Sequence, residues 1–586
     1  MRKPRPLRLK IPVRTPAPVR FCDGSPDAIA AWIGTLPRTD AALVCRSTID
    51  ALTQLYHAES DAATRLRQLE TLRPAATAAG ASLAHLARSG APGGIDARRR
   101  RALAAQTLSL HLATGYKLVI LDALRAGARG SAQVRPGSPG AVLVTAVHRA
   151  TTELSRLLLR ALQLYAPAPP RLWDELHQFY LLAEAQGFAD LRITDPEQRH
   201  RRQSTIAEAY TRAILLAAAQ PNSLRHEPIQ QLFDALEDWT RFTRITPPGD
   251  GDPRVIRVDL AGDEPPVQAR LHRPGEDEDP RLIDSRALVR LLTESLGTAA
   301  GRAATERTPA RPEGLSDDLV RHCIRAWTGD VRRVARRTPA SGRFEVCLGL
   351  AAVHFHAGGG VAFEAQLGIP RQSLAVLDDG FADATVFGSP RLVDRGSAAA
   401  SHAPDEHRLH RVELVDAGPG GFGIEWDDVP SEALQIGELI GLREGADHHW
   451  GLGIVRWLST ESDDIRAGIE MIAPRLLPAG VRLRGVRDAR SDWVRALRIP
   501  AMEVLGQPAL LITPPLPFRT GHKVALHEDG ETQEVRLETL RVTSPGFSVF
   551  EYRPIEGLLP ATETGIVKQD VGGKRHDIWA SVTYRR

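Results

Sequence analysis

The sequence has few lysines, cysteines and aromatic residues, and it has no long hydrophobic run. Six of its 586 residues are lysine, so arginine supplies 69 of the 75 basic side chains. The four cysteines are far apart and form no CxxC pair, so neither a zinc knuckle nor a disulfide framework is indicated. Apolar runs such as Ile214–Ala219 are far shorter than the roughly 18–20 residues that a membrane-spanning helix needs. With 42% hydrophobic and 25% charged residues, the composition is that of an ordinary globular protein.

The near balance of charge argues against a dedicated nucleic-acid binder. The 75 basic and 71 acidic residues leave a net charge of only +4, and the aromatic residues on which bases would stack make up 5% of the chain. The basic N-terminus is broken up by prolines and lacks the apolar core and cleavage site of a signal peptide. We therefore expect a disordered cationic tail there and, because the cysteines are few and scattered, a cytoplasmic location.

The hydrophobic pattern changes along the chain and predicts a multidomain α+β protein. Leu154, Leu157, Leu158 and Leu162 recur at helical spacing in the first half, whereas short alternating segments fill the second half. The expected parts are a basic disordered tail over 1–22, an all-α helical-hairpin domain over 23–247, a small α/β connector over 248–297, a linker over 298–315, an antiparallel β-barrel over 316–476 with an insertion over 358–403, and a β-rich C-terminal module over 477–586.

One stretch of the helical half has the spacing that opens a tetratricopeptide repeat. Trp173, Leu176 and Tyr180 match it, but His177 stands where that repeat has glycine, and no second copy follows in register. We therefore favour a single amphipathic helix whose large side chains face the core.

The histidines of the barrel region raise the question of a metal. Phe344–Leu350 alternates as a half-buried strand does, and a continuation would place His354 and His356 on one face of it. A third ligand at suitable spacing is missing, so we expect no metal site and no cofactor. The sequence also lacks the nucleophile elbow, the zinc-protease motif and the phosphate loop, so we expect no enzyme.

Two motifs bracket the first strands of the predicted barrel. The first is an arginine cluster, Arg332, Arg333, Arg336 and Arg337, which contains two overlapping R-x-x-x-R pairs. The second is the turn Asp416–Gly421, with three glycines and a proline in six residues and a carboxylate at its entry. Each has a simpler interpretation, as a solvated charge run and as an ordinary glycine-rich hairpin. Their order around a matching strand pattern favours a shared function.

Together the two motifs resemble the PilZ domain, the cyclic di-GMP receptor module of bacteria. That family has R-x-x-x-R ahead of its first strand and [Asp/Asn]-x-Ser-x-x-Gly after its second, seen here as Asp416, Gly418 and Gly421. A strand with a Gly–aliphatic pair normally follows, seen here as Gly423 and Ile424. The resemblance covers residues 330–474 and implies a ligand site made of Arg332, Arg333, Arg336, Arg337, Asp416, Gly418 and Gly421.

The residue types suit a cyclic dinucleotide. The resemblance implies that the arginines hold guanine edges and phosphates, while Asp416 and the turn hold a base; an arginine can pair with guanine O6 and N7 or grip a phosphate. We expect a non-catalytic effector that binds cyclic di-GMP and passes the signal to an unknown protein partner through its helical region. The alternative is a degenerate PilZ-like scaffold without nucleotide, which Gly418 in place of serine and the roughly eighty residues between the motifs favour.

Overall fold

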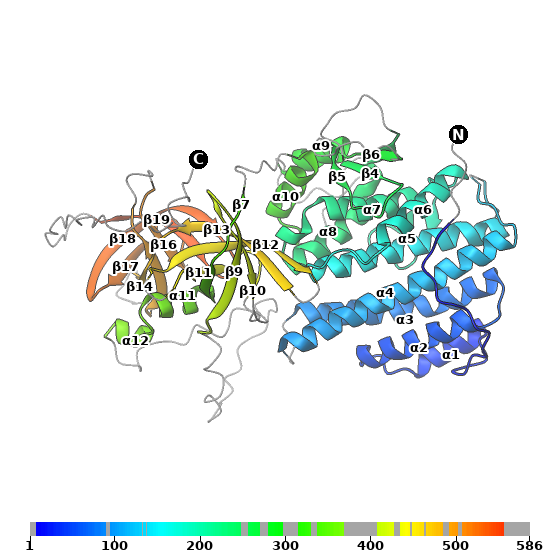
Figure 1. Ribbon diagram of the computed structural model, residues 1–586, viewed down its shortest axis with the longest axis horizontal. Coiled ribbons are helices and arrows are strands. Elements are labelled where there is room, and N and C mark those ends of the chain that lie inside the picture. The colour runs from blue at the N-terminus through cyan, green and yellow to red at the C-terminus, as the bar shows by residue number, and fades with distance from the viewer. Residues whose placement is uncertain are drawn as a thin grey trace. The chain divides into compact units, whose positions relative to one another are not determined.

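Helices make up the first part of the chain and strands the second in the computed structural model (Figure 1). The chain divides into two units, residues 1–332 with 459–461 and residues 333–458 with 462–586. The structure describes residues 7–89, 94–131, 133–135, 137–247, 256–269, 279–296, 314–329, 337–368, 407–426, 434–445, 448–461, 464–484, 492–501 and 507–555.

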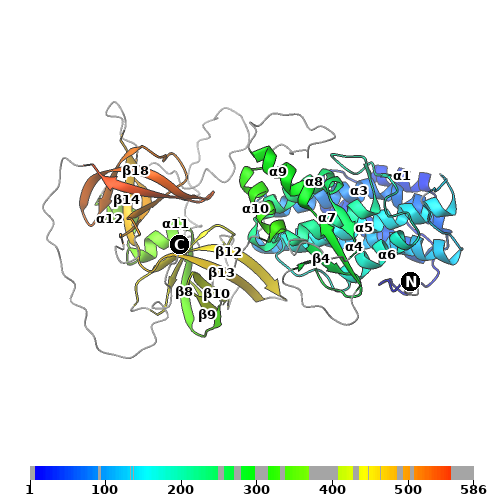
Figure 2. The ribbon, with the colours of Figure 1, turned by 90° about the horizontal axis from the view of Figure 1, so that it is seen from above.

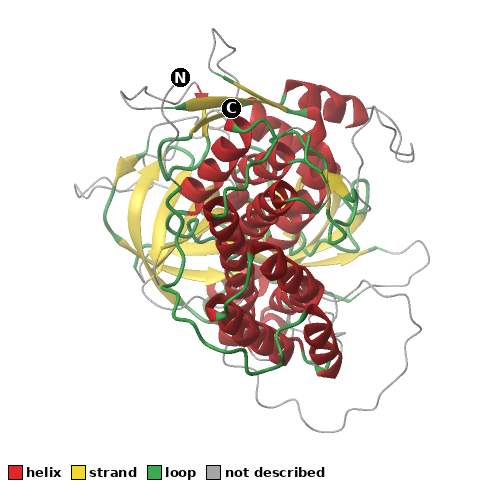
Figure 3. Ribbon diagram, turned by 90° about the vertical axis from the view of Figure 1, so that its right-hand side faces the viewer, coloured by secondary structure: helices red, strands yellow, loops and turns green. Residues whose placement is uncertain are grey.

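In the described residues of the first unit, the first eight helices pack side by side (Figure 3). They are α1 (Pro26–Thr35), α2 (Ala41–His57), α3 (Ala62–Arg88), α4 (Gly94–Arg125), α5 (Pro139–Gln163), α6 (Leu172–Ala185), α7 (Ile206–Ala218) and α8 (His226–Trp239), with the two-residue strands β1 (Ile193–Thr194) and β2 (Gln203–Ser204) pairing between α6 and α7. Within the described part of the chain, no helix combines the length and the apolar character needed to cross a membrane.

Local sequence sets where these helices begin. The Asp61 carboxylate accepts the amide hydrogens of Ala63 and Thr64 at the start of α3, and Thr205 with Glu208 forms a capping box on α7. Helix α5 is buried along most of its length, so many of its polar side chains are internal; Thr151 and Ser155, for example, donate to the carbonyl four residues earlier.

The tetratricopeptide-like spacing belongs to a single core helix, as favoured above. Trp173, Leu176 and Tyr180 of α6 are all buried. His177 is fully buried as well, with Nδ1 at 2.8 Å from the Tyr210 hydroxyl. The side chain that departs from the repeat pattern is therefore part of the packing between α6 and α7.

The N-terminal segment corrects the prediction of a disordered tail for residues 7–22, and residues 1–6 lie outside the described residues. Residues 7–22 run without helix or strand along the helices of the first unit and pack Leu9, Ile11 and Phe21 against its core. The contacts are largely made by the backbone: the amide of Arg8 donates to Gln178 Oε1, and that of Lys10 to Glu175 Oε1, both at 2.6 Å. Composition alone suggested disorder, but these long-range hydrogen bonds hold the segment in place.

The expected connector is a small sheet packed into the first unit. Strands β3 (Arg244–Thr246), β6 (Pro280–Asp284), β4 (Ile256–Asp259) and β5 (Val267–Gln268) lie in that order, and α9 (Arg286–Leu296) follows. Strands β4 and β5 are antiparallel neighbours, with Ile256 opposite Gln268. The predicted linker 298–315 lies almost wholly outside the described residues.

Helix α10 (Asp317–Thr328), which the sequence analysis placed at the start of the barrel domain, packs into the first unit. Its buried face, including Val320, Cys323 and Trp327, belongs to the core of the first unit. The Trp327 indole donates from Nε1 to the Leu215 carbonyl at 3.0 Å and meets the Trp239 ring edge to face. By its packing, α10 is therefore part of the helical unit.

The second unit contains two closed six-stranded antiparallel barrels, which confirms the predicted fold class (Figure 2). The first barrel has the order β8-β9-β10-β13-β12-β11, from β8 (Arg343–Leu348), β9 (His410–Gly418), β10 (Gly421–Trp426), β11 (Leu439–Arg443), β12 (Gly451–Glu461) and β13 (Asp464–Ala473), with short β7 (Thr338–Pro339) beside β9. The second has the order β14-β15-β16-β19-β18-β17, from β14 (Leu477–Leu483), β15 (Val494–Ile499), β16 (Leu510–Thr513), β17 (Lys523–Glu528), β18 (Glu531–Thr543) and β19 (Ser548–Pro554).

Helix α11 (Gly349–Ala357) corrects the predicted continuation of a strand through the two histidines. It lies between the two barrels (Figure 2), and the Nε2 atom of its buried His354 is 3.1 Å from the Ala479 carbonyl of the second barrel. Gly349, with φ of +84°, turns the chain out of β8 into this helix. Nε2 of His356 lies 2.7 Å from the His407 carbonyl. In the described part of the chain, no group of three or more possible ligands could hold a metal ion.

The predicted insertion 358–403 begins with structured residues. Gly358–Gly368 contains the short helix α12 (Phe363–Gln366), and the Phe363 ring stands edge to face against His354. Residues 369–406 lie outside the described residues.

Candidate functional site

The glycine-rich turn predicted from the sequence connects β9 to β10. Gly418 and Gly421 face each other across this hairpin, with Pro419 and Gly420 at its tip. At Gly421, φ is +151°, and a Cβ atom there would stand 1.8 Å from the Ile469 carbonyl oxygen of β13. Only glycine allows this approach, because the obstacle is backbone that cannot turn aside.

Asp416 lies on the same hairpin, opposite a residue without a side chain. Its cross-strand partner is Gly423, and the register shifts directly afterwards, where Ile424 faces Leu414. A Cβ atom on Gly423 would lie 2.7–2.9 Å from the carboxylate atoms of Asp416. The carboxylate therefore lies over the backbone of β10, in the space that the glycine leaves open beside a β-bulge.

Arg337 reaches this carboxylate from the other sequence motif. Its Nη1 atom donates to Asp416 Oδ1 at 2.8 Å, while the two side chains remain 39% and 31% exposed. The position follows from β7, in which Thr338 pairs with Ala417 and Pro339 with Asp416. The fold thus brings together two motif residues that are 79 positions apart in the sequence.

The long spacing between the motifs has a structural explanation. Strand β8 pairs directly with β9, with Phe344 opposite Val412, although about sixty residues separate the two strands along the chain. Helices α11 and α12 and the segment outside the described residues all fall between these two neighbouring strands. The insertion therefore leaves the pairing that positions Asp416 intact.

The predicted site residues are only partly described. The structure brings Arg337, Asp416, Gly418 and Gly421 together on β9, β10 and the approach to β7. Arg332, Arg333 and Arg336 lie outside the described residues. Sequence reasoning noted Gly423 only as part of a Gly–aliphatic pair and gave it no place in the site. A signal for it was present, because a glycine that faces an acidic residue across a predicted hairpin leaves room for that side chain.

The arrangement can bind a polar ligand at its exposed edge. The Asp416 carboxylate has oxygen lone pairs beyond the one that Arg337 uses, and the guanidinium of Arg337 has several N–H donors beyond the one it gives. Such a pair presents acceptors and donors next to each other, directly before β7 and on β9. A purine base with adjacent N–H and carbonyl groups has the complementary pattern.

Comparisons with known proteins cover almost the whole chain. Residues 27–249 match the model of the N-terminal domain of the cyclic-di-GMP receptor FimW, residues 255–386 and 388–478 that of its middle PilZ domain, and residues 479–555 that of its C-terminal β-barrel domain. The cyclic-di-GMP receptor FimW of Pseudomonas aeruginosa is 31% identical to this chain, and the match covers 94% of each of the two proteins. No solved structure matches the chain.

Proposed function

Because this chain belongs to the family of the cyclic di-GMP receptor FimW, we propose that it binds cyclic di-GMP at the site around Asp416 and acts as a non-catalytic signalling effector in the cytoplasm. The observation that carries the proposal is the ion pair between Arg337 and Asp416, which joins the two motifs at one place on the first barrel. A dinucleotide receptor needs both a carboxylate for a base and arginines for bases or phosphates within reach of one ligand.

In this proposal Asp416 accepts hydrogen bonds from the N1 and N2 hydrogens of a guanine. Arg337, with Arg332, Arg333 and Arg336 from the preceding segment, binds guanine edges and phosphates. Gly421 and Gly423 keep the hairpin backbone and the carboxylate in position, because a Cβ atom at either residue would collide with Ile469 or Asp416. Gly418 offers no hydroxyl, so we propose that its contribution is limited to the shape of the turn.

Calorimetric titration of the full-length protein with cyclic di-GMP tests the site, with GTP as the control ligand. We expect binding that Asp416→Ala weakens by roughly tenfold or more, because a charge-assisted hydrogen bond is lost. Glu413→Ala is the matched control: it lies on the same strand, is exposed and pairs with Arg343 at 3.3 Å, yet it is outside the proposed site. Absence of heat from folded wild-type protein, or equal loss in both variants, would favour the nucleotide-free scaffold.

We also propose that binding is passed on to a protein partner through the helical unit. The arginine cluster directly links α10, which ends at Thr328 with Gly329 as its C-cap, to β7, which starts at Thr338. A ligand held by those arginines would act on the short connection between the units. A ligand shifts such an equilibrium only by its different affinity for the two states.

Small-angle scattering of the full-length protein with and without saturating cyclic di-GMP tests this transmission. We expect the radius of gyration or the distance distribution to change in the wild-type protein and to stay constant in Asp416→Ala. Identical curves for wild-type protein that calorimetry shows to be saturated would contradict the transmission and leave the binding proposal standing.

A further inference from the structure

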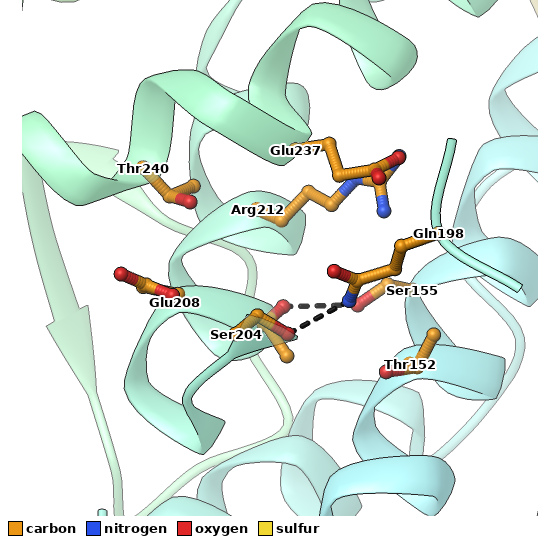
Figure 4. A pocket seen from close by; sticks show the side chains of 9 residues that line it. Thr152, Ser155, Gln198, Ser204, Glu208, Arg212, Glu237 and Thr240 are labelled. Carbon is orange, nitrogen blue, oxygen red and sulfur yellow. Dashed lines mark hydrogen bonds and ion pairs between the residues drawn. The ribbon is translucent and has the colours of Figure 1, made fainter. Parts of the chain in front are cut away.

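The helical unit contains a polar cleft that is unrelated to the site on the first barrel. Its volume is about 460 Å³, and it is lined by α3, α4, α5, α7 and α8 together with the loop between β1 and β2. A smaller cavity of about 10 Å³ adjoins it and shares Gln198, Arg212 and Glu237. Figure 4 shows this cavity, with Thr152 and Ser155 facing those side chains from α5. Volumes of several hundred Å³ are typical of sites for small ligands.

An unpaired acceptor lies in the wall that the cleft and the small cavity share. Gln198 is 8% exposed, and its Nε2 atom donates to Ser204 Oγ at 2.7 Å. Its Oε1 atom has no hydrogen-bond donor among the residues that the structure describes. A buried amide oxygen without a partner costs about 1–3 kcal/mol, so a ligand with an N–H group would stabilise this position.

Arg160 of α5 is a cation without a carboxylate partner in the described residues of the cleft. Its Nη1 atom donates to two neutral amides, Gln163 Oε1 at 2.8 Å and Gln230 Oε1 at 3.2 Å. Burial, and then the charges of Arg88 and Arg156, lowers the pKa of Arg160 to about 9. A negative charge beside this guanidinium would therefore be favourable.

Most other charges in the cleft already have partners. Arg88 pairs with Glu227 at 3.1 Å, Arg156 with Glu153 at 2.7 Å, and Arg199 with Asp234 at 3.6 Å. Arg212 pairs with Glu237, whose Oε1 also accepts the amide hydrogens of His200 and Arg201. Glu197 lines the cleft without an ion pair among the described residues.

The paired and unpaired charges of the cleft favour one kind of ligand. Five carboxylates and five arginines line the cleft, and four of these arginines pair with carboxylates. A ligand with several negative charges, such as a phosphorylated nucleotide, would therefore find only the Arg160 guanidinium without a carboxylate partner among the described residues, and carboxylates around it. One negative group for Arg160, and N–H donors for Gln198 and Glu197, fit a peptide instead. Small and apolar side chains, among them Ala76, Leu108 and Leu159, form the rest of the wall and suit aliphatic parts of such a ligand.

We propose that this cleft binds a carboxylate-bearing peptide, whose carboxylate pairs with Arg160 and whose backbone N–H donates to Gln198 Oε1. The site goes beyond the proposed binding of cyclic di-GMP, and it uses none of the residues around Asp416. A peptide segment of a partner protein could therefore be recognised by the helical unit whether or not the barrel binds a nucleotide.

Ligand-observed NMR with full-length protein tests the proposal. The probe is a defined mixture of N-acetylated tripeptides with free C-terminal carboxylates, compared with the same tripeptides as C-terminal amides and with inorganic phosphate. We expect the wild-type protein to bind members of the carboxylate set, and Arg160→Gln to weaken that binding roughly tenfold or more. Gln198→Met should also weaken peptide binding, and it tests the site independently if Arg160→Gln fails to fold.

Two controls separate this site from others. Arg67→Gln removes an exposed arginine of α3 whose side chain donates to the neutral Thr64 hydroxyl, and it should leave peptide binding unchanged. Asp416→Ala should also bind peptide normally, which separates the failure of this proposal from that of cyclic di-GMP binding. The proposal is overturned if no carboxylate peptide binds, if the amides bind equally well, or if phosphate displaces the peptides at equal concentration. It is also overturned if the cleft variants bind the peptides as the wild type does.

Discussion

At the residue scale, two glycines of the β9–β10 hairpin are required for different reasons. A side chain on Gly421 would collide with the backbone carbonyl of Ile469, which belongs to the barrel itself. A side chain on Gly423 would instead meet the end of the Asp416 side chain, which can rotate. The first glycine therefore serves the fold, whereas the second serves the position of one carboxylate.

Substitution of Gly423 separates binding from stability. In Gly423→Ala the new methyl group displaces the Asp416 carboxylate from Arg337, so we expect the affinity for cyclic di-GMP to fall about tenfold. The change in the free energy of unfolding should stay near 1 kcal/mol, because only a half-exposed ion pair is disturbed. Calorimetric titration and thermal unfolding measure the two effects. Gly34→Ala in α1, with no atom within 4 Å of the new Cβ, is the control for affinity. An equal affinity in both variants would contradict the role given to Gly423.

At the scale of elements, the N-terminal segment covers a buried ion pair. Lys117 and Glu175, 1% and 3% exposed, pair at 2.6 Å between α4 and α6. The backbone of Lys10 completes the group, since its amide donates to Glu175 Oε1 and its carbonyl accepts from Lys117 Nζ at 3.3 Å. A segment without regular structure thus supplies both a donor and an acceptor to charges that would otherwise lie unsatisfied at the edge of the core.

Removal of this segment should destabilise the helical unit. We expect deletion of residues 1–20 to lower the free energy of unfolding by roughly 3 kcal/mol, because the hydrogen bonds to a buried ion pair and the packing of Leu9 and Ile11 are lost. Urea unfolding followed by circular dichroism measures it. Lys10→Ala is the control, since its backbone contacts remain and its stability should equal that of the wild type. A deletion variant as stable as the wild type would contradict the stabilising role of this segment.

At the scale of the whole molecule, buried histidines make the helical unit sensitive to acid. Burial lowers the pKa of His148 to about 3 and of His177 and His226 to about 4. For His148 the geometry adds a reason, because Nδ1 accepts from the Arg149 guanidinium and could take a proton only against that charge. Unfolded histidine has a pKa near 6.5, so the unfolded chain binds more protons at lower pH.

The free energy of unfolding of this unit should therefore be greatest above pH 6.5 and fall as the pH decreases toward 4. Each such histidine contributes a loss of at most about 2 kcal/mol between pH 6.5 and 5. Urea titrations at pH 7 and pH 5, followed by the helical signal at 222 nm, measure the decrease. In His148→Gln the difference between the two pH values should be smaller, and an unfolding midpoint that is independent of pH would exclude this mechanism.

Much of the fold and part of the site followed from the sequence, because they depend on short-range patterns. The change from helical to strand-forming spacing along the chain, the core role of Trp173, and the turn at Asp416–Gly421 are each encoded by the spacing of apolar residues or by glycines within a dozen positions. The order of the two motifs was sufficient to indicate the PilZ-like barrel.

Tertiary structure alone decided the features that depend on distant partners. The amide of Lys10 is held by Glu175, 165 positions away, and α10 joins the helical core through the contact of Trp327 with Leu215. The apolar run after β8 became the helix α11 because it packs between two barrels, a choice that alternation cannot reveal. The cleft around Arg160 and Gln198 collects side chains from elements spread over some 160 residues, so no local pattern marks it.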